Sequence, residues 1–200
     1  MTAHMANARY THRFSPKFSV FGEYTFTRRE FDPPSIDYDI NEPSFGITYA
    51  FSPTFNASAQ VGYFWQEPET GDKTDGPTYK ASITNRDVRT TYVVSLQGGY
   101  SEDYFTSENL GFNRYHRLTG SVTHFLEKRT SIGFSGSVER AEYVDEDRDD
   151  WIWGVSGRLS HTPLKWLTLS LEISHRELNS DIETEDYKEN RAIIKITATY

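Results

Sequence analysis

Residues 190–200 read NRAIIKITATY, and this stretch decides the fold. Residues two positions apart on a β-strand lie on the same face of the sheet. From Arg191 to Tyr200 one face would carry Ala, Ile, Ile, Ala and Tyr, and the other Arg, Ile, Lys and two Thr. Residues 167–173 (LTLSLEI) repeat the alternation. A strand that is apolar on one side, charged or hydroxylated on the other, and closed by an aromatic residue is typical of a transmembrane β-barrel.

The composition narrows the class of protein. The 200 residues carry a net charge of −8, contain no cysteine, and are 36% hydrophobic and 15% aromatic. No stretch is long and apolar enough for a transmembrane helix, whereas a barrel strand turns only every second residue to lipid and keeps a low mean hydropathy. The absence of cysteine excludes a disulfide framework and a thiolate metal site, and the net acidity argues against nucleic acid as a partner.

The same alternation recurs along the chain and predicts about eleven strands. The expected strands cover residues 8–15, 18–27, 44–51, 55–65, 79–84, 91–100, 115–126, 132–139, 151–159, 166–173 and 190–200. We therefore predict an all-β fold, an antiparallel up-and-down transmembrane β-barrel with 11–12 strands in this chain, and treat residues 1–200 as a single outer-membrane barrel.

The connections alternate strictly between short turns and longer, mostly acidic loops. The turns are expected at residues 15–17, 52–54, 85–87, 127–129 and 161–163, and the loops at 32–43, 67–77, 101–109, 145–150 and 179–186. Outer-membrane barrels have short periplasmic turns and long extracellular loops. We therefore expect the short turns and the C-terminus on the periplasmic side, and the first strand to run from the outside to the inside.

The strand number predicts that the barrel is larger than this chain. Bacterial single-chain barrels have an even number of strands, so at least one strand is expected upstream, and the chain would be the C-terminal part of a longer barrel. A twelve-strand barrel whose first strand lies in the N-terminal residues is the alternative. Residues 1–6 show no signal peptide, so we expect that it was removed or belongs to a longer chain.

The apolar face could point to lipid, as in a membrane barrel, or to a core, as in a soluble sandwich. Three features favour lipid. The polar face mixes both charge signs with Ser, Thr and Gly; aromatic residues gather near strand ends on the apolar face; and small residues such as Ala57, Gly98 and Gly136 interrupt that face. A soluble core packed with such small residues would contain voids, each of which lowers stability, whereas lipid fills gaps.

The polar face supplies the predicted site. Its charged residues are expected to line the lumen: Arg9, Arg13, Glu23, Lys80, Arg117, Glu139, Arg158, Glu172, Arg191 and Lys195. Cations outnumber acids in this set although the whole chain is acidic. One hypothesis is that a positive stripe helps anionic sugars to pass; the other is that these charges pair across strands and only rigidify the wall.

Residues 76–200 resemble the outer-membrane β-barrel porins associated with exopolysaccharide export. The resemblance rests on residues 174–180 (SHRELNS), the pairs Asp186-Tyr187 and Asn190-Arg191, the alternating last strand, and Gly-Pro followed by Tyr-x-Ala at residues 76–81. It implies a barrel of more strands than this chain supplies and a role as an outer-membrane channel, with export of an anionic polysaccharide as the candidate task. Resemblance to outer-membrane proteins also implies that the barrel assembly machinery reads Tyr200.

The sequence contains no recognisable catalytic or cofactor motif. Its six histidines do not fall at metal-ligand spacing, and no nucleophile elbow or phosphate-binding loop occurs. An acidic run could offer oxygen ligands to calcium, although a solvated loop is the simpler interpretation: Asp145, Glu146, Asp147, Asp149 and Asp150. We predict no enzyme activity, cofactor or metal, and outer-membrane lipid, the assembly machinery and a polysaccharide as partners. A barrel enzyme acting on lipid or peptide and a soluble all-β binding protein are the alternatives.

Overall fold

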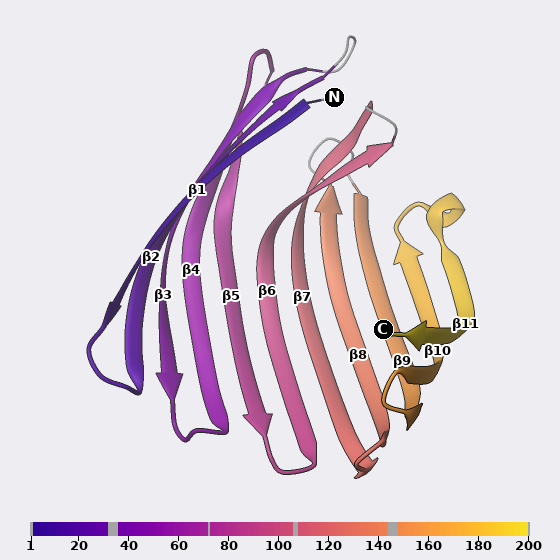
Figure 1. Ribbon diagram of the computed structural model, residues 1–200. Coiled ribbons are helices and arrows are strands. Elements are labelled where there is room, and N and C mark those ends of the chain that lie inside the picture. The colour runs from indigo at the N-terminus through magenta and orange to yellow at the C-terminus, as the bar shows by residue number, and fades with distance from the viewer. Residues whose placement is uncertain (1, 32–35, 72, 106–107, 144–147, 200) are drawn as a thin grey trace.

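The computed structural model describes residues 2–31, 36–71, 73–105, 108–143 and 148–199. Eleven strands form one antiparallel sheet in which each strand pairs with its neighbours in sequence (Figure 1). They are β1 (Thr2–Arg13), β2 (Phe18–Glu30), β3 (Tyr38–Ala50), β4 (Phe55–Pro68), β5 (Thr74–Arg86), β6 (Thr90–Phe105), β7 (Glu108–Glu127), β8 (Thr130–Tyr143), β9 (Arg148–Leu164), β10 (Leu167–Ser180) and β11 (Tyr187–Ala198), with a 3-10 turn at Glu183–Glu185.

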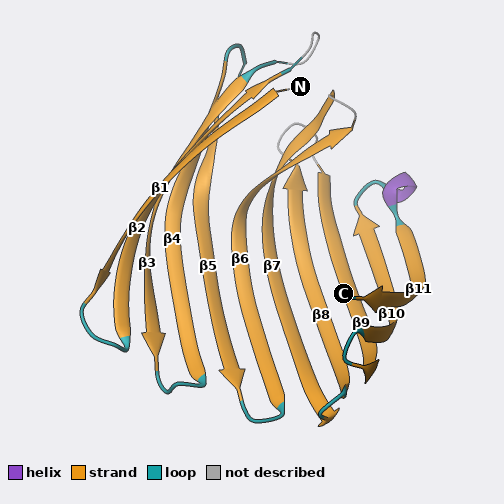
Figure 2. Cartoon of the chain, in the orientation of Figure 1, coloured by secondary structure: helices purple, strands orange, loops and turns teal. Residues whose placement is uncertain are grey.

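The sheet is curved like the wall of a barrel but is open, with β1 and β11 as its two edges (Figure 2). The short turns lie at one end of the strands and the longer connections at the other (Figure 1). The predicted all-β, up-and-down architecture and its eleven strands are confirmed. Among the residues described, no helix has the length and apolar character needed to cross a membrane.

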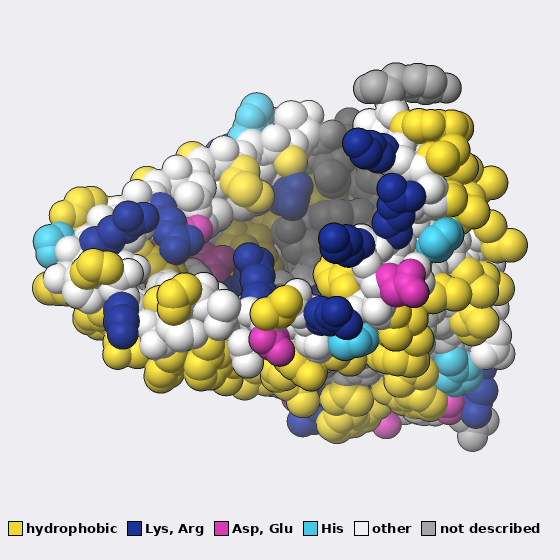
Figure 3. Space-filling view, turned by 60° about the horizontal axis from the view of Figure 1, so that its bottom comes forward, with side chains coloured by type: hydrophobic (Ala, Val, Ile, Leu, Met, Phe, Trp, Pro, Cys, Tyr) yellow, Lys and Arg dark blue, Asp and Glu magenta, His cyan; other side chains and the backbone are white. Residues whose placement is uncertain are grey.

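The two faces of the sheet differ in chemistry as the alternation predicts. Large apolar side chains cover the convex face and are strongly exposed: Phe45 is 54% exposed, Val61 62% and Ile194 78%. An exposed apolar surface this large is typical of contact with a membrane or a partner and not with water. The ten charged residues predicted to line the lumen lie on the opposite, concave face, where Figure 3 shows Lys and Arg bordering a hollow.

Two predicted loops are partly wrong, because both contain prolines that the structure places inside strands. β3 begins at Tyr38 and includes Pro43, and β5 begins at Thr74 and includes Pro77. Pro43 pairs with β2, but the β3–β4 ladder is interrupted beside it. Pro77 pairs with β4, while the β5–β6 ladder begins only at Tyr79. Each proline therefore lies where one neighbouring strand is unpaired, so its missing N–H costs no ladder hydrogen bond.

The predicted acidic loops at 101–109 and 145–150 are also shorter than expected. β6 continues to Phe105, β7 starts at Glu108, and β9 starts at Arg148. The segment at 115–126 belongs to β7, which is the longest strand at 20 residues. Antiparallel pairing with a neighbour overrides the low strand propensity of acidic residues, so the strands extend beyond the clearly alternating segments.

The turns after β1 and β3 are copies of each other in sequence and geometry. Both read Phe-Ser-Pro-x-Phe, and in both the second Phe donates its backbone N–H to the serine Oγ at 3.0 Å. In both, the two phenylalanine rings stack, with centroids 5.6 Å apart for Phe14 and Phe18 and 4.8 Å apart for Phe51 and Phe55. The repeat fixes two hairpins with the same register and the same aromatic pair at the turn.

A small apolar cluster lies toward the long-loop end of the sheet. Phe31, Tyr38, Ile40 and Phe64 are buried together, and Tyr100 packs against them. The rings of Phe64 and Tyr100 have centroids 4.7 Å apart. Gly76, opposite Phe64 in the β4–β5 ladder, leaves room for this ring, because a Cβ there would lie 3.1 Å from Phe64 Cε1. The cluster joins β3 and β4 to β6 across β5.

Candidate functional site

The strand register places all ten predicted lumen residues on one face of the sheet. Arg9 is opposite Glu23, Arg117 opposite Glu139, and Arg158 opposite Glu172. The other four occupy the same parity of their strands: Arg13, Lys80, Arg191 and Lys195. This face is concave, and the opposite one carries the exposed apolar side chains. The structure thus brings the ten residues to a common surface, and their role as a lumen lining stays a prediction.

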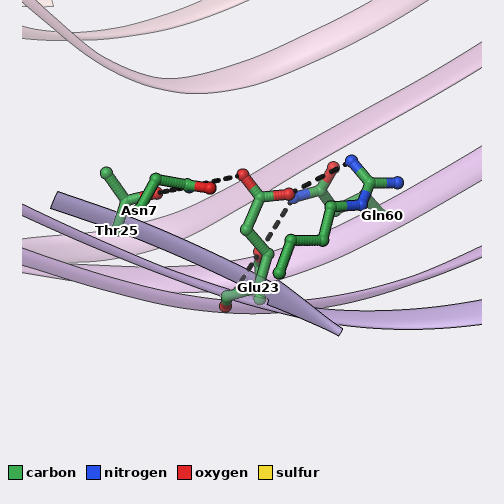
Figure 4. A network of polar contacts seen from close by, with 6 residues as sticks. Asn7, Glu23, Thr25 and Gln60 are labelled. Atoms are coloured by element: carbon green, nitrogen blue, oxygen red, sulfur yellow. Dashed lines mark hydrogen bonds and ion pairs between the residues drawn. The ribbon is translucent and has the colours of Figure 1, made fainter. Parts of the chain in front are cut away.

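The pair between β1 and β2 is the centre of a polar network. Arg9 Nη1 lies 3.2 Å from Glu23 Oε2, and Asn7 Nδ2 donates to Glu23 Oε1 at 2.8 Å. Figure 4 shows Asn7 beside both Glu23 and Thr25, with Gln60 nearby. The Arg9 guanidinium also lies 3.7 Å from the centre of the Phe21 ring. Several contacts therefore fix Glu23, and its charge is compensated by Arg9.

Two further Arg–Glu pairs follow on later strands. Arg117 Nε donates to Glu139 Oε2 at 2.5 Å. Arg158 donates to Glu172 through Nε at 2.8 Å and also through Nη2. All three glutamates of the predicted set are thus paired with an arginine on the neighbouring strand. For these six residues the structure supports the hypothesis of charge pairing across strands.

The four other cations have a different environment. Within the described part of the chain, Arg13, Lys80, Arg191 and Lys195 have no carboxylate within 4.0 Å. Arg13 is the last residue of β1, Lys80 is in the middle of β5, and the other two lie on β11. They are therefore spread along the wall and not gathered in one pocket. These four cations carry the positive excess of the predicted set.

Sequence reasoning missed an acidic residue on the same face. Glu42 lies in the segment expected to be a loop, and it lines a hollow of about 400 Å³ together with Gln60, Lys80 and Gln97. Tyr100 donates a long hydrogen bond of 3.4 Å to Glu42 Oε2. The alternation of residues 44–48, continued back through Pro43, would have found it. Glu23 lines the same hollow, which therefore contains two carboxylates and the ammonium group of Lys80.

Between the charged residues the concave face is lined with paired hydroxyls. Ser58 and Ser82 are 2.9 Å apart, Ser135 and Ser156 2.7 Å, and Ser160 and Ser170 2.9 Å, each measured between Oγ atoms. Hydroxyls donate and accept hydrogen bonds and rotate to suit a partner. This surface is therefore suited to water and to hydroxylated solutes.

The acidic run expected near residue 145 is divided between the two faces. Asp149 Oδ2 accepts from Arg140 at 2.8 Å, while Asp150, whose side chain is fully buried, accepts two hydrogen bonds from Arg148. Asp145, Glu146 and Asp147 lie outside the described residues. Over the ranges that the structure describes, no cluster of potential metal ligands is present. Tyr200, the predicted assembly signal, also lies outside the described residues.

A curved antiparallel sheet with an apolar convex face and a charged, hydroxylated concave face defines the wall of a transmembrane β-barrel. The chain belongs to the family described as "Putative beta-barrel porin 2", whose sequence profile matches residues 1–200. The family is one of porins and not of enzymes. A search of the curated proteins gives no significant match.

A solved outer-membrane channel shares the fold. The outer-membrane channel DcaP of Acinetobacter baumannii has a TM-score of 0.70 and 12% identity, over 97% of this chain and 62% of that one. This chain thus spans less than two thirds of the DcaP chain. The NanC porin (TM-score 0.47, 12% identity, 99% and 94% coverage) and the KdgM porin (0.39, 12%, 99% and 96%) are more distant in shape. At 12% identity the likeness to DcaP shows the fold alone.

Proposed function

We propose that this chain forms part of the wall of an outer-membrane channel that favours anionic solutes. We also propose that the solute exported through this channel is an anionic polysaccharide. The observation that carries the proposal is the group of four concave-face cations without a carboxylate partner. Membership of a porin family supports the channel itself. The three Arg–Glu pairs stiffen the wall, so four cations of the predicted set remain to attract an anion: Arg13, Lys80, Arg191 and Lys195.

The spacing of these cations suits a polymer. Arg191 and Lys195 are four residues apart on one strand, which is roughly 13 Å. Because Arg13, Lys80 and this pair lie on three different strands and at different points along them, an anionic chain could contact them in succession. The hydroxyl pairs between them can bond sugar hydroxyls. Contacts that are numerous and individually weak allow entry and release, as conduction requires.

Replacing Arg191 and Lys195 by glutamine is expected to lower the preference for anions. A unit charge about 10 Å from an ion across water contributes roughly 0.4 kcal/mol, or about twofold in local ion concentration. Each charge also lowers the local cation concentration about twofold, so the double variant should lose about sixteenfold of the anion-over-cation permeability ratio. The ratio is measured from reversal potentials in planar bilayers, at low salt because screening is weak there, with protein made from its whole natural coding sequence.

The matched control removes a pair and leaves the net charge unchanged. Arg158→Gln combined with Glu172→Gln should keep the wild-type ratio, because the two charges already compensate each other. If the Arg191 and Lys195 variant conducts with the wild-type ratio, the four cations do not select the solute. If the control shifts the ratio as much, the effect comes from disturbance of the wall and not from charge.

A further inference from the structure

The short turns carry a row of exposed cations that the proposed channel does not use. Four of the five short turns contain at least one, and we call the set the basic rim: Lys17, Arg89, Lys128, Arg129 and Lys165. Among the described residues none of the five has a carboxylate within 4.0 Å. At the opposite end of the sheet the lysines are paired: Lys73 lies 2.8 Å from Glu67, and Lys188 lies 3.0 Å from Glu177.

Aromatic side chains lie at the same end of the sheet as the basic rim. The stacked pairs at the first two turns leave Phe14 63% and Phe51 52% exposed, and Tyr92 and Trp166 are exposed to a similar degree. The cations of the rim lie within a few residues of a strand end, as for Lys17, Arg89, Lys128 and Lys165. Lys165 also directly precedes Trp166. Aromatic side chains at strand ends lie at the level of lipid headgroups. The long aliphatic part of a nearby lysine side chain lets its ammonium group reach the same level.

We propose that the basic rim binds the phosphate groups of anionic phospholipids in the leaflet beside the short turns. The rim offers unpaired positive charge, and the aromatic residues hold it at headgroup depth. Its cations are distributed turn by turn along an edge and do not converge on one pocket, so they match a ligand arrayed side by side in a membrane surface. The inference rests on lipid contact of the convex face but not on the ion selectivity of the channel.

The expected strength follows from charge near an anionic surface. Each lysine or arginine there contributes about 1 kcal/mol, which is about fivefold in affinity. Three lysines lie in three different turns, so replacing Lys17, Lys128 and Lys165 by glutamine weakens the rim without removing Arg129, which also donates to the Pro163 carbonyl oxygen. The triple variant should lose at least about tenfold of the preference for an anionic over a zwitterionic lipid.

Trp166 provides a reporter inside the rim. With Trp65, Trp151 and Trp153 replaced by phenylalanine, quenching by brominated phosphatidylglycerol or brominated phosphatidylcholine measures which lipid lies beside Trp166. We expect phosphatidylglycerol to be preferred by at least about tenfold, and this preference to fall by at least about fivefold in the lysine triple variant, which removes Lys165 beside Trp166 but keeps Arg129. The matched control removes three cations from the other end, by Arg28→Gln, Lys73→Gln and Lys188→Gln, and should keep the wild-type preference.

Native mass spectrometry of the protein with all four tryptophans gives a second readout, which does not depend on folding of the single-tryptophan variant. It compares retained phosphatidylglycerol and phosphatidylcholine molecules. Equal retention of both lipids, or an unchanged preference in the lysine triple variant, would overturn the inference. A wild-type protein that shows normal ion selectivity but no lipid preference rejects the lipid site alone, whereas lipid preference in a protein that does not conduct rejects the channel alone.

Discussion

Replacing Asp150 by alanine is expected to lower the free energy of unfolding by about 3–5 kcal/mol. The Asp150 side chain is fully buried, and its two oxygens accept from Arg148 Nε at 2.9 Å and Nη2 at 2.6 Å. Arg148 is itself only 14% exposed and lies 4.5 Å from the centre of the Tyr143 ring. Removing the carboxylate would therefore take the bidentate partner from a largely buried guanidinium, whose contact with the half-exposed Glu185 is longer, at 3.8 Å. Losing that partner costs more than the pair itself contributes.

Asp149 is the matched control, because it is adjacent in sequence and also paired with an arginine. Its side chain and that of Arg140 are 35% and 40% exposed, so water screens the pair. Asp149→Ala should change stability by less than about 1 kcal/mol. Urea unfolding in detergent micelles, followed by gel mobility with and without boiling, measures both variants. Equal losses for the two would show that burial of Asp150 does not govern its contribution.

Replacing Phe64 by alanine is expected to cost a similar amount, about 3–5 kcal/mol. Phe64 is fully buried and packs with Ile40, which is 1% exposed, and with the Tyr100 ring. Because Gly76 has no side chain to move into the space, the neighbourhood can collapse only partly. The loss should appear as a lower urea midpoint with an unchanged slope, since the same surface is exposed on unfolding.

The variant Phe64→Leu distinguishes the contribution of buried apolar volume to stability from that of the aromatic ring contact. Leucine keeps most of the buried surface, so the expected loss is at most about half that of alanine. A leucine variant as unstable as the alanine variant would point to the ring contact with Tyr100 as the larger contribution. An alanine variant with wild-type stability would mean that β3 and β4 do not depend on this cluster.

The alternation was enough to predict the strand count, the order of the strands and the two faces. Two of the three ion pairs also follow from the predicted turns at 15–17 and 127–129. The third does not, because the turn predicted at 161–163 is wrong: β9 continues through Pro163 to Leu164, and the turn is at Lys165 and Trp166. In each pair the arginine and the glutamate lie the same number of residues from the middle of the turn. The middle residue is Pro16 for Arg9 and Glu23. It is Lys128 for Arg117 and Glu139, and Lys165 for Arg158 and Glu172. A short turn fixes the register of its hairpin, so residues equidistant from it face each other.

The errors have physical causes as well. Pro43 and Pro77 led to two predicted loops, because sequence alone does not tell which strand edge lacks a ladder neighbour. For that reason Glu42 was missed as a concave-face acid. The buried state of Asp150 was equally hidden, since an acidic run is usually solvated, and only the strand register turns Asp150 inward toward Arg148 while Asp149 points to the other face.

The central claim is that the convex face contacts lipid and the concave face contacts water. The chain has no cysteine, so single cysteines can be placed in turn at Val94, Ser95, Leu96 and Gln97 of β6, with the protein reconstituted in lipid vesicles. A membrane-impermeant maleimide should label Ser95→Cys and Gln97→Cys rapidly and Val94→Cys and Leu96→Cys slowly, with a period of two residues. The reverse pattern, or equal labelling at all four positions, would contradict the account.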